Sequence, residues 1–215
     1  MLARLVTQPR YFFKEQTKYR GTRTQSMLVA AIGIAFALTH VGAYYQLGET
    51  AIDVYEVIIL YIGLSLAVPF TIWLASTILM ALVSRILSRG LLIGELFRLV
   101  GWGLYPLLVA GLVQSAGRLY AVRDTAAPEL GLFSHLSYEW EQYGIYLESA
   151  NSDPVFLGAT LFAVVAVLYA GYLWTIAVKE LSEFDNVDMA TSTALVISAI
   201  PTTLCLLWIL TPFYI

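Results

Sequence analysis

The chain has 215 residues, of which 59% are apolar and 13% are charged, and its net charge is −3. A soluble protein is expected to have roughly 45–50% apolar and 25% charged residues, so this composition excludes an ordinary soluble domain. The single cysteine, Cys205, excludes an internal disulfide and a cysteine-rich metal site.

The charges are segregated along the chain. Residues 24–48, 57–84, 99–117, 154–178 and 189–215 contain no Asp, Glu, Lys or Arg. Each of these windows can hold an apolar helix of about 18 to 25 residues, the length that crosses a hydrocarbon core of about 30 Å. We therefore predict an all-α, polytopic integral membrane protein with five transmembrane helices.

Residues 1–24 form a basic arm, in which six Lys or Arg residues face a single acid, Glu15. Pro9 indicates a helix start, and Tyr11, Phe12 and Phe13 would give that helix an aromatic face. Two compatible interpretations remain open for the arm: an amphipathic helix on anionic headgroups, or a basic stub that fixes the topology.

The first two spans are predicted at 27–45 and 57–83, joined by an acidic turn. The first span is too long for the apolar region of a signal peptide, so we expect a retained signal anchor. His40 has no acid three or four residues away, and we interpret it as an interface histidine rather than as a proton or metal site. Pro69 interrupts the second span.

The third span, predicted at 99–116, contains Gly101-Trp102-Gly103-Leu104-Tyr105-Pro106. A proline inside a helix supplies no N–H, so we expect the carbonyl of Trp102 to lose its partner. The glycines leave the backbone open to close approach, and lipid tolerates such a break only where neighbouring helices cover it. We interpret the segment as a packing and bending device.

The longest polar segment is the acidic loop 117–153. Apolar residues recur in it at steps of three and four, which predicts a helix of about four turns. That helix would lie on the membrane surface or cap the bundle, and a lid over a ligand or partner is the alternative. Its apolar stripe consists of Phe133, Leu136, Trp140, Tyr143 and Leu147.

The last two spans are predicted at 155–178 and 190–211, and Pro201 interrupts the second of them. The basic side of the bundle carries ten Lys or Arg residues and the opposite side two, so the positive-inside rule predicts a cytoplasmic amino terminus and an extracytoplasmic carboxyl terminus in the cell membrane. Nine of the fifteen acids fall on the outer side, which suggests a high-salt habitat.

Three features resemble the Yip domain family, five-span membrane proteins named for interaction with Ypt/Rab GTPases, and in particular its bacterial and archaeal branch. They are Pro9 with Phe12-Phe13 before the first span, the Gly101–Pro106 pattern in the third span, and the turn 179–194 that enters the last span. The resemblance covers nearly the whole chain. It implies a single membrane domain over 1–215, with five transmembrane helices, an amino-terminal helix and a helical outer loop.

The sequence contains no nucleotide-binding, metalloprotease or nucleophile-elbow motif, and no acid lies deep in a span. We therefore predict a non-enzymatic scaffold or adaptor that uses no cofactor or metal. Its expected partners are membrane lipids and either another protein or a second copy of this chain. We expect it to bind no nucleic acid and no recognisable small molecule. Its cytoplasmic face would combine the arm with residues 84–98 and 179–188. The candidate partner residues are Arg85, Arg89, Glu95, Arg98, Lys179 and Glu180.

Two further interpretations concern charges and breaks. The pairs Glu95/Arg98 and Lys179/Glu180 sit at corresponding ends of the third and fourth spans and either pair with each other or anchor the interface.

The alternative function is a small permease or an accessory membrane subunit of an ATP-driven transporter. It would use the carbonyls freed at the interrupted spans to line a pathway.

Overall fold

The computed structural model describes residues 2–16, 21–87, 92–128, 136–181 and 187–211, and this part of the chain contains helices and turns but no strand. Five segments of the described chain are long and apolar enough to cross a membrane. The predicted class, an all-α polytopic membrane protein with five spans, is confirmed.

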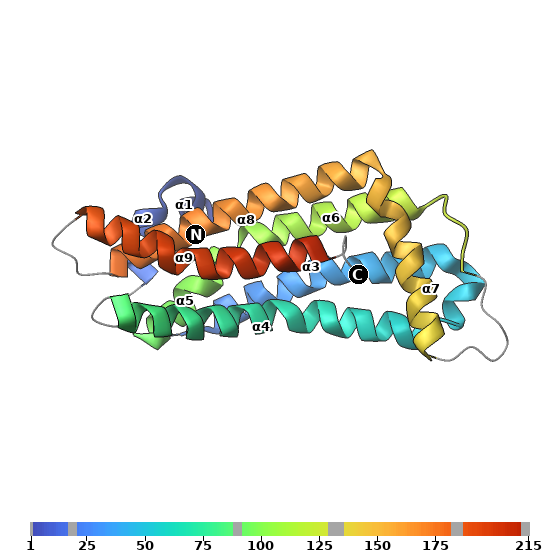
Figure 1. Cartoon of the computed structure of the whole chain (residues 1–215), viewed down its shortest axis with the longest axis horizontal. Coiled ribbons are helices and arrows are strands. Elements are labelled where there is room, and N and C mark those ends of the chain that lie inside the picture. Colours follow the sequence, from blue (N-terminus) through green and yellow to red (C-terminus); the bar gives the residue numbers. More distant parts are fainter. Residues whose placement is uncertain (1, 17–20, 88–91, 129–135, 182–186, 212–215) are drawn as a thin grey trace.

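Five long rods form the bundle, and one of them is divided into two helices (Figure 1). Each predicted span lies within one rod, except that the last predicted span, 190–211, extends one residue beyond its helix. The rods are α3 (Arg23–Leu47), α4 (Tyr55–Leu87), α5 (Ile93–Gly103) with α6 (Pro106–Val122), α8 (Pro154–Leu181) and α9 (Val187–Leu210).

Short helices mark the two ends of the bundle. At the arm end lie α1 (Leu2–Thr7) and α2 (Pro9–Gln16), next to α8 (Figure 1). At the opposite cap end, α7 (Leu136–Glu148) runs across the ends of the long helices, and the 3-10 turns Gly48–Ile52 and Ser149–Ser152 connect neighbouring elements. The helix predicted in the acidic loop therefore exists, and it crosses the end of the bundle.

Small residues allow the long helices to approach closely. A Cβ atom on Gly33 of α3 would lie 2.9 Å from the Cα atom of Leu66 in α4, and one on Gly117 of α6 would lie 2.6 Å from Cβ of Ala159 in α8. Such contacts are typical of helix packing in membranes, where apolar burial from water does not drive association. Large apolar side chains stay exposed along the outer faces of the bundle, where lipid would contact them; examples are Ile34, Leu74, Leu161 and Leu207.

The three interrupted spans behave differently. Pro69 and Pro201 are buried inside continuous helices, whereas Pro106 begins α6 after a break. The expectation that the Trp102 carbonyl loses its partner is wrong: it accepts a hydrogen bond from the N–H of Tyr105 at 3.1 Å. This is the tighter bond that often ends a helix, and it satisfies the carbonyl that a continuous helix would have paired with residue 106.

Candidate functional site

The break between α5 and α6 is lined by indole side chains. Trp174 of α8 donates from Nε1 to the carbonyl of Val100 at 3.1 Å, and Trp73 of α4 donates to the carbonyl of Phe97 at 2.6 Å. The Trp73 ring also stacks on Phe97 with 3.9 Å between centroids. Two carbonyls of α5 therefore have interhelical donors, a polar connection that is expected of an irregular helix in lipid.

The two glycines of this segment make room for the indoles. A Cβ atom on Gly101 would lie 2.8 Å from Cβ of Gln25 and 3.1 Å from the Trp73 ring, and one on Gly103 would overlap the Trp174 ring. The α5 backbone at Gly101 and Gly103 thus lies closer to the Trp73 and Trp174 rings than a residue with a Cβ atom at either position would permit. This geometry is consistent with a packing role for the segment.

A third indole joins the break to the amino-terminal arm. Trp102 donates from Nε1 to Oε1 of Gln16 at 3.0 Å, and its ring meets Phe12 edge-on with 5.2 Å between centroids. Phe12, Phe13 and Gln16 are buried, and α2 packs against α8 and α5. Two of the three aromatic residues predicted for the arm, Phe12 and Phe13, therefore face the bundle, whereas Tyr11 is 75% exposed, and Arg10 and Lys14 are exposed as well.

The predicted partner residues that the structure describes all lie at the arm end. Arg85 is exposed in the last turn of α4, and Glu95 and Arg98 are half-buried on α5. Lys179 donates to Oγ1 of Thr191 at 2.7 Å, and Glu180 lies 4.0 Å from Nε of Arg10. Arg89 lies outside the described residues. The pairing of Glu95/Arg98 with Lys179/Glu180 stays a prediction.

At the cap end, the predicted apolar stripe of α7 packs only in part. Tyr143 and Leu147 are buried and Trp140 is half-buried, stacking on Tyr61 with 4.4 Å between centroids. Leu136 is 49% exposed and so packs less closely than the rest of the stripe, and Phe133 lies outside the described residues. The contacts with α4 and α6 favour a cap over a helix that lies on the membrane surface.

Sequence reasoning missed a polar cluster beneath α7. The Nδ1 atom of His40 lies 3.0 Å from the hydroxyl of Tyr143, a residue 103 positions away, and the His40 ring stacks on Tyr61 at 5.0 Å. Burial raises the pKa of Tyr143 above its usual value. The only signal in the sequence was the position of Tyr143 in the predicted apolar stripe. His40, interpreted from the sequence as an interface histidine, is buried at the cap end with a polar partner and a stacked ring.

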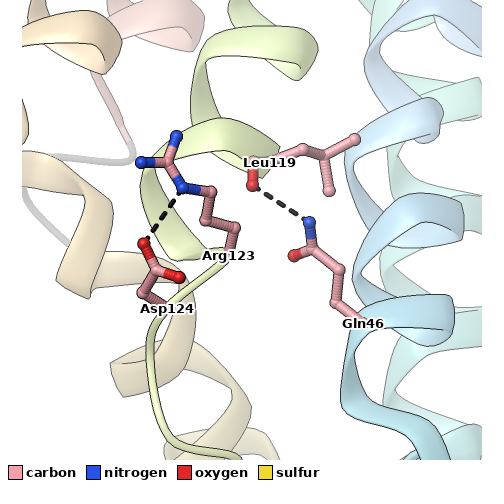
Figure 2. A network of polar contacts seen from close by, with 4 residues as sticks. All are labelled: Gln46, Leu119, Arg123 and Asp124. Carbon is pink, nitrogen blue, oxygen red and sulfur yellow. Dashed lines mark hydrogen bonds and ion pairs between the residues drawn. The ribbon is translucent and has the colours of Figure 1, made fainter.

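The carboxyl-terminal end of α6 carries two arginines in unlike surroundings. Arg123 is exposed and donates from Nε to Asp124 at 3.0 Å. Close to this pair, the side chain of Gln46 in α3 donates a hydrogen bond to the Leu119 carbonyl at 3.0 Å (Figure 2). Arg118, one turn earlier, lies beside the Phe156 ring, with Cζ 4.5 Å from the ring centroid. Its Nε and Nη2 atoms are buried and have no hydrogen-bond partner among the residues that the structure describes.

No set of three or more His, Cys, Asp or Glu side chains in the described residues could hold a metal ion. In the comparison with known families, a family model described as the Yip1 domain matches residues 3–210. No curated protein and no solved structure matches the chain.

Proposed function

Because the chain belongs to the Yip1 domain family, a family of membrane proteins, we propose that it is a non-enzymatic multi-pass scaffold or adaptor, with 1–215 acting as a single membrane domain. Its partner-binding face would be the arm end of the bundle. We further propose that this end is cytoplasmic, since the basic residues concentrate there, and that the cap end is extracytoplasmic.

The docked arm is the observation that carries this proposal. Phe12 and the Trp102–Gln16 hydrogen bond attach α2 to the bundle, and this places the exposed Arg10 and Lys14 at the same end as Arg85. A face whose charges are already in place loses less conformational entropy when a partner binds than a flexible basic tail would lose. Its charge would favour an acidic partner surface and speed the encounter.

The transporter alternative has less support. It requires backbone carbonyls that are free to line a pathway, but the carbonyls of Phe97, Val100 and Trp102 at the main break all accept hydrogen bonds. The break therefore favours a packing function.

Membrane orientation can be tested with single cysteines, because Cys205 is buried and gives little background. Lys14→Cys at the arm end and Glu141→Cys on α7 both place the thiol at exposed positions. In intact cells a membrane-impermeant maleimide should label only Glu141→Cys, and permeabilised cells should label both. Labelling of Lys14→Cys alone in intact cells would reverse the proposed orientation.

Partner binding can be tested by quantitative crosslinking and mass spectrometry in native membranes. Charge reversal at Arg85, Arg89 and Arg98 should remove crosslinks between the arm end and a partner or second copy, while Arg123→Glu at the cap end should leave them unchanged. Both variants should keep the wild-type thermal stability in detergent. Unchanged crosslinks in the triple variant would contradict an arm-end binding face.

A further inference from the structure

The guanidinium group of Arg118 has one edge without a partner. Nε and Nη2 are both buried, and neither donates a hydrogen bond to a described residue. The neighbouring Phe156 ring, 4.5 Å from Cζ, attracts the positive charge, but it offers no oxygen atom to these N–H groups. Buried N–H donors of a charged group are strongly unfavourable without hydrogen bonds, so this edge requires an acceptor.

The two unpartnered atoms define the kind of acceptor. The N–H of Nε and one N–H of Nη2 lie in the guanidinium plane and point in parallel from the same edge of the group. Two oxygens of one phosphate group match this spacing, so both bonds form to a single anion. Lysine, a point charge, could not reproduce that side-on geometry.

No neighbouring side chain that the structure describes bonds to this edge. Tyr61, Tyr143 and Glu148 lie within electrostatic range of Arg118. The Tyr143 hydroxyl already contacts His40 at 3.0 Å, and Glu148 is exposed at the end of α7. Glu148 is thus the acid of this group that could compete with a ligand for Arg118.

The position of Arg118 suits a headgroup. It directly follows the uncharged window 99–117 and lies in the last turns of α6, while Phe156 lies in the first turn of α8. Both residues therefore lie at the level where a membrane span ends and lipid phosphates begin. We propose that Arg118 binds a phosphate group side-on through Nε and Nη2 at the cap end, as carried by a phospholipid headgroup or by a free anion. This site does not depend on the arm-end function or on the membrane orientation.

The test measures binding to the purified full chain in an uncharged detergent by native mass spectrometry and thermal stability. The probes are a short-chain phosphatidylglycerol, the matching diacylglycerol without phosphate, and inorganic phosphate. We compare the wild type with Arg118→Gln, Arg118→Lys and Glu148→Gln. Arg123→Gln is the matched control, since Arg123 is an exposed arginine on the next turn with its own acidic partner.

Phosphatidylglycerol should bind the wild type and Arg123→Gln equally, and its apparent affinity for Arg118→Gln should fall by about tenfold or more, as expected for lost charge-assisted hydrogen bonds. Arg118→Lys should recover only part of that loss. Binding of inorganic phosphate with the same dependence on Arg118, but not of the lipid, would support the site and assign it to a soluble anion.

Three results would overturn the proposal. The first is equal binding of the phosphate probes by Arg118→Gln and the wild type. The second is that Glu148→Gln loses as much thermal stability as Arg118→Gln, while neither phosphate probe changes the stability of the wild type. That result would make Glu148 the partner of Arg118. If neither Arg118 variant folds, the wild type decides alone: no preference for phosphatidylglycerol over diacylglycerol, together with no effect of inorganic phosphate, excludes the site.

Discussion

Replacing Gly103 with alanine adds a single carbon atom where α5 meets α8. The new Cβ would overlap the Trp174 ring, which is fully buried and cannot swing aside. Either the indole moves and its hydrogen bond to the Val100 carbonyl, 3.1 Å long, is lost, or α5 moves away from α8. Both responses disturb the contact that holds the break in place.

The expected magnitude follows from three contributions. Overpacking a close contact costs about 1–3 kcal/mol. Loss of the indole hydrogen bond adds about 0.5–1.5 kcal/mol. Alanine is a better helix former than glycine, so the replacement also stabilises the helix by roughly 1 kcal/mol, which offsets part of this cost. The sum is a destabilisation of about 2 kcal/mol, which lowers the Tm of a chain of this size by about 4–8 °C.

The assay is thermal unfolding in detergent at one fixed scan rate, because membrane proteins often unfold irreversibly. Gly63→Ala in α4 is the matched control, since a Cβ atom there meets nothing within 4 Å. Its Tm should be unchanged or slightly raised. A Trp174→Phe background should reduce the effect of Gly103→Ala, because the two sites are in contact. Equal Tm values for Gly103→Ala and Gly63→Ala would refute the packing argument.

Three other predictions can be measured on the same preparations. Gly101→Leu should lower the Tm by more than Pro106→Ala does, because a side chain at position 101 has no room. Pro106 occupies the first turn of α6, where its missing N–H matters little. Equal shifts in Tm for the two variants would contradict this prediction. Trp102→Phe removes the bond to Gln16 and should raise amide hydrogen exchange in α2 while leaving exchange in the middle of α8 unchanged. The pKa of Tyr143 is raised in the folded protein, so the stability that its neutral form contributes is present below about pH 10 and is lost at higher pH. Tyr143→Phe should therefore lose less stability than the wild type between about pH 9 and about pH 11, and identical pH profiles would contradict the burial of this hydroxyl.

The spans were predictable because the requirement that defines them is local. A helix in lipid needs about 20 consecutive uncharged residues, and such uncharged windows can be read directly from the sequence. The helix at the cap end was predictable for a related reason, since Trp140, Tyr143 and Leu147 repeat with helical spacing.

What the sequence did not reveal depends on contacts between distant residues. The Trp102 carbonyl is satisfied by a tightened turn at Tyr105, which depends on where α5 ends. His40 has no acid three or four residues away in the sequence, and its contact with Tyr143 arises only when α7 crosses the bundle. The unpartnered edge of Arg118 is equally invisible, because the spacing of charges along a chain does not report which atoms of a guanidinium are buried.

The length of α4 links the protein to the thickness of its bilayer. Its uncharged stretch, residues 57–84, has 28 residues and is about 42 Å long, whereas the hydrocarbon core is about 30 Å thick. An upright α4 would suffer hydrophobic mismatch, which a tilt or a thicker local bilayer relieves. Because α3 and α9 pack against α4, they would tilt with it. The tilt of the whole bundle, and with it the height of α2 above the membrane, should therefore vary with lipid chain length.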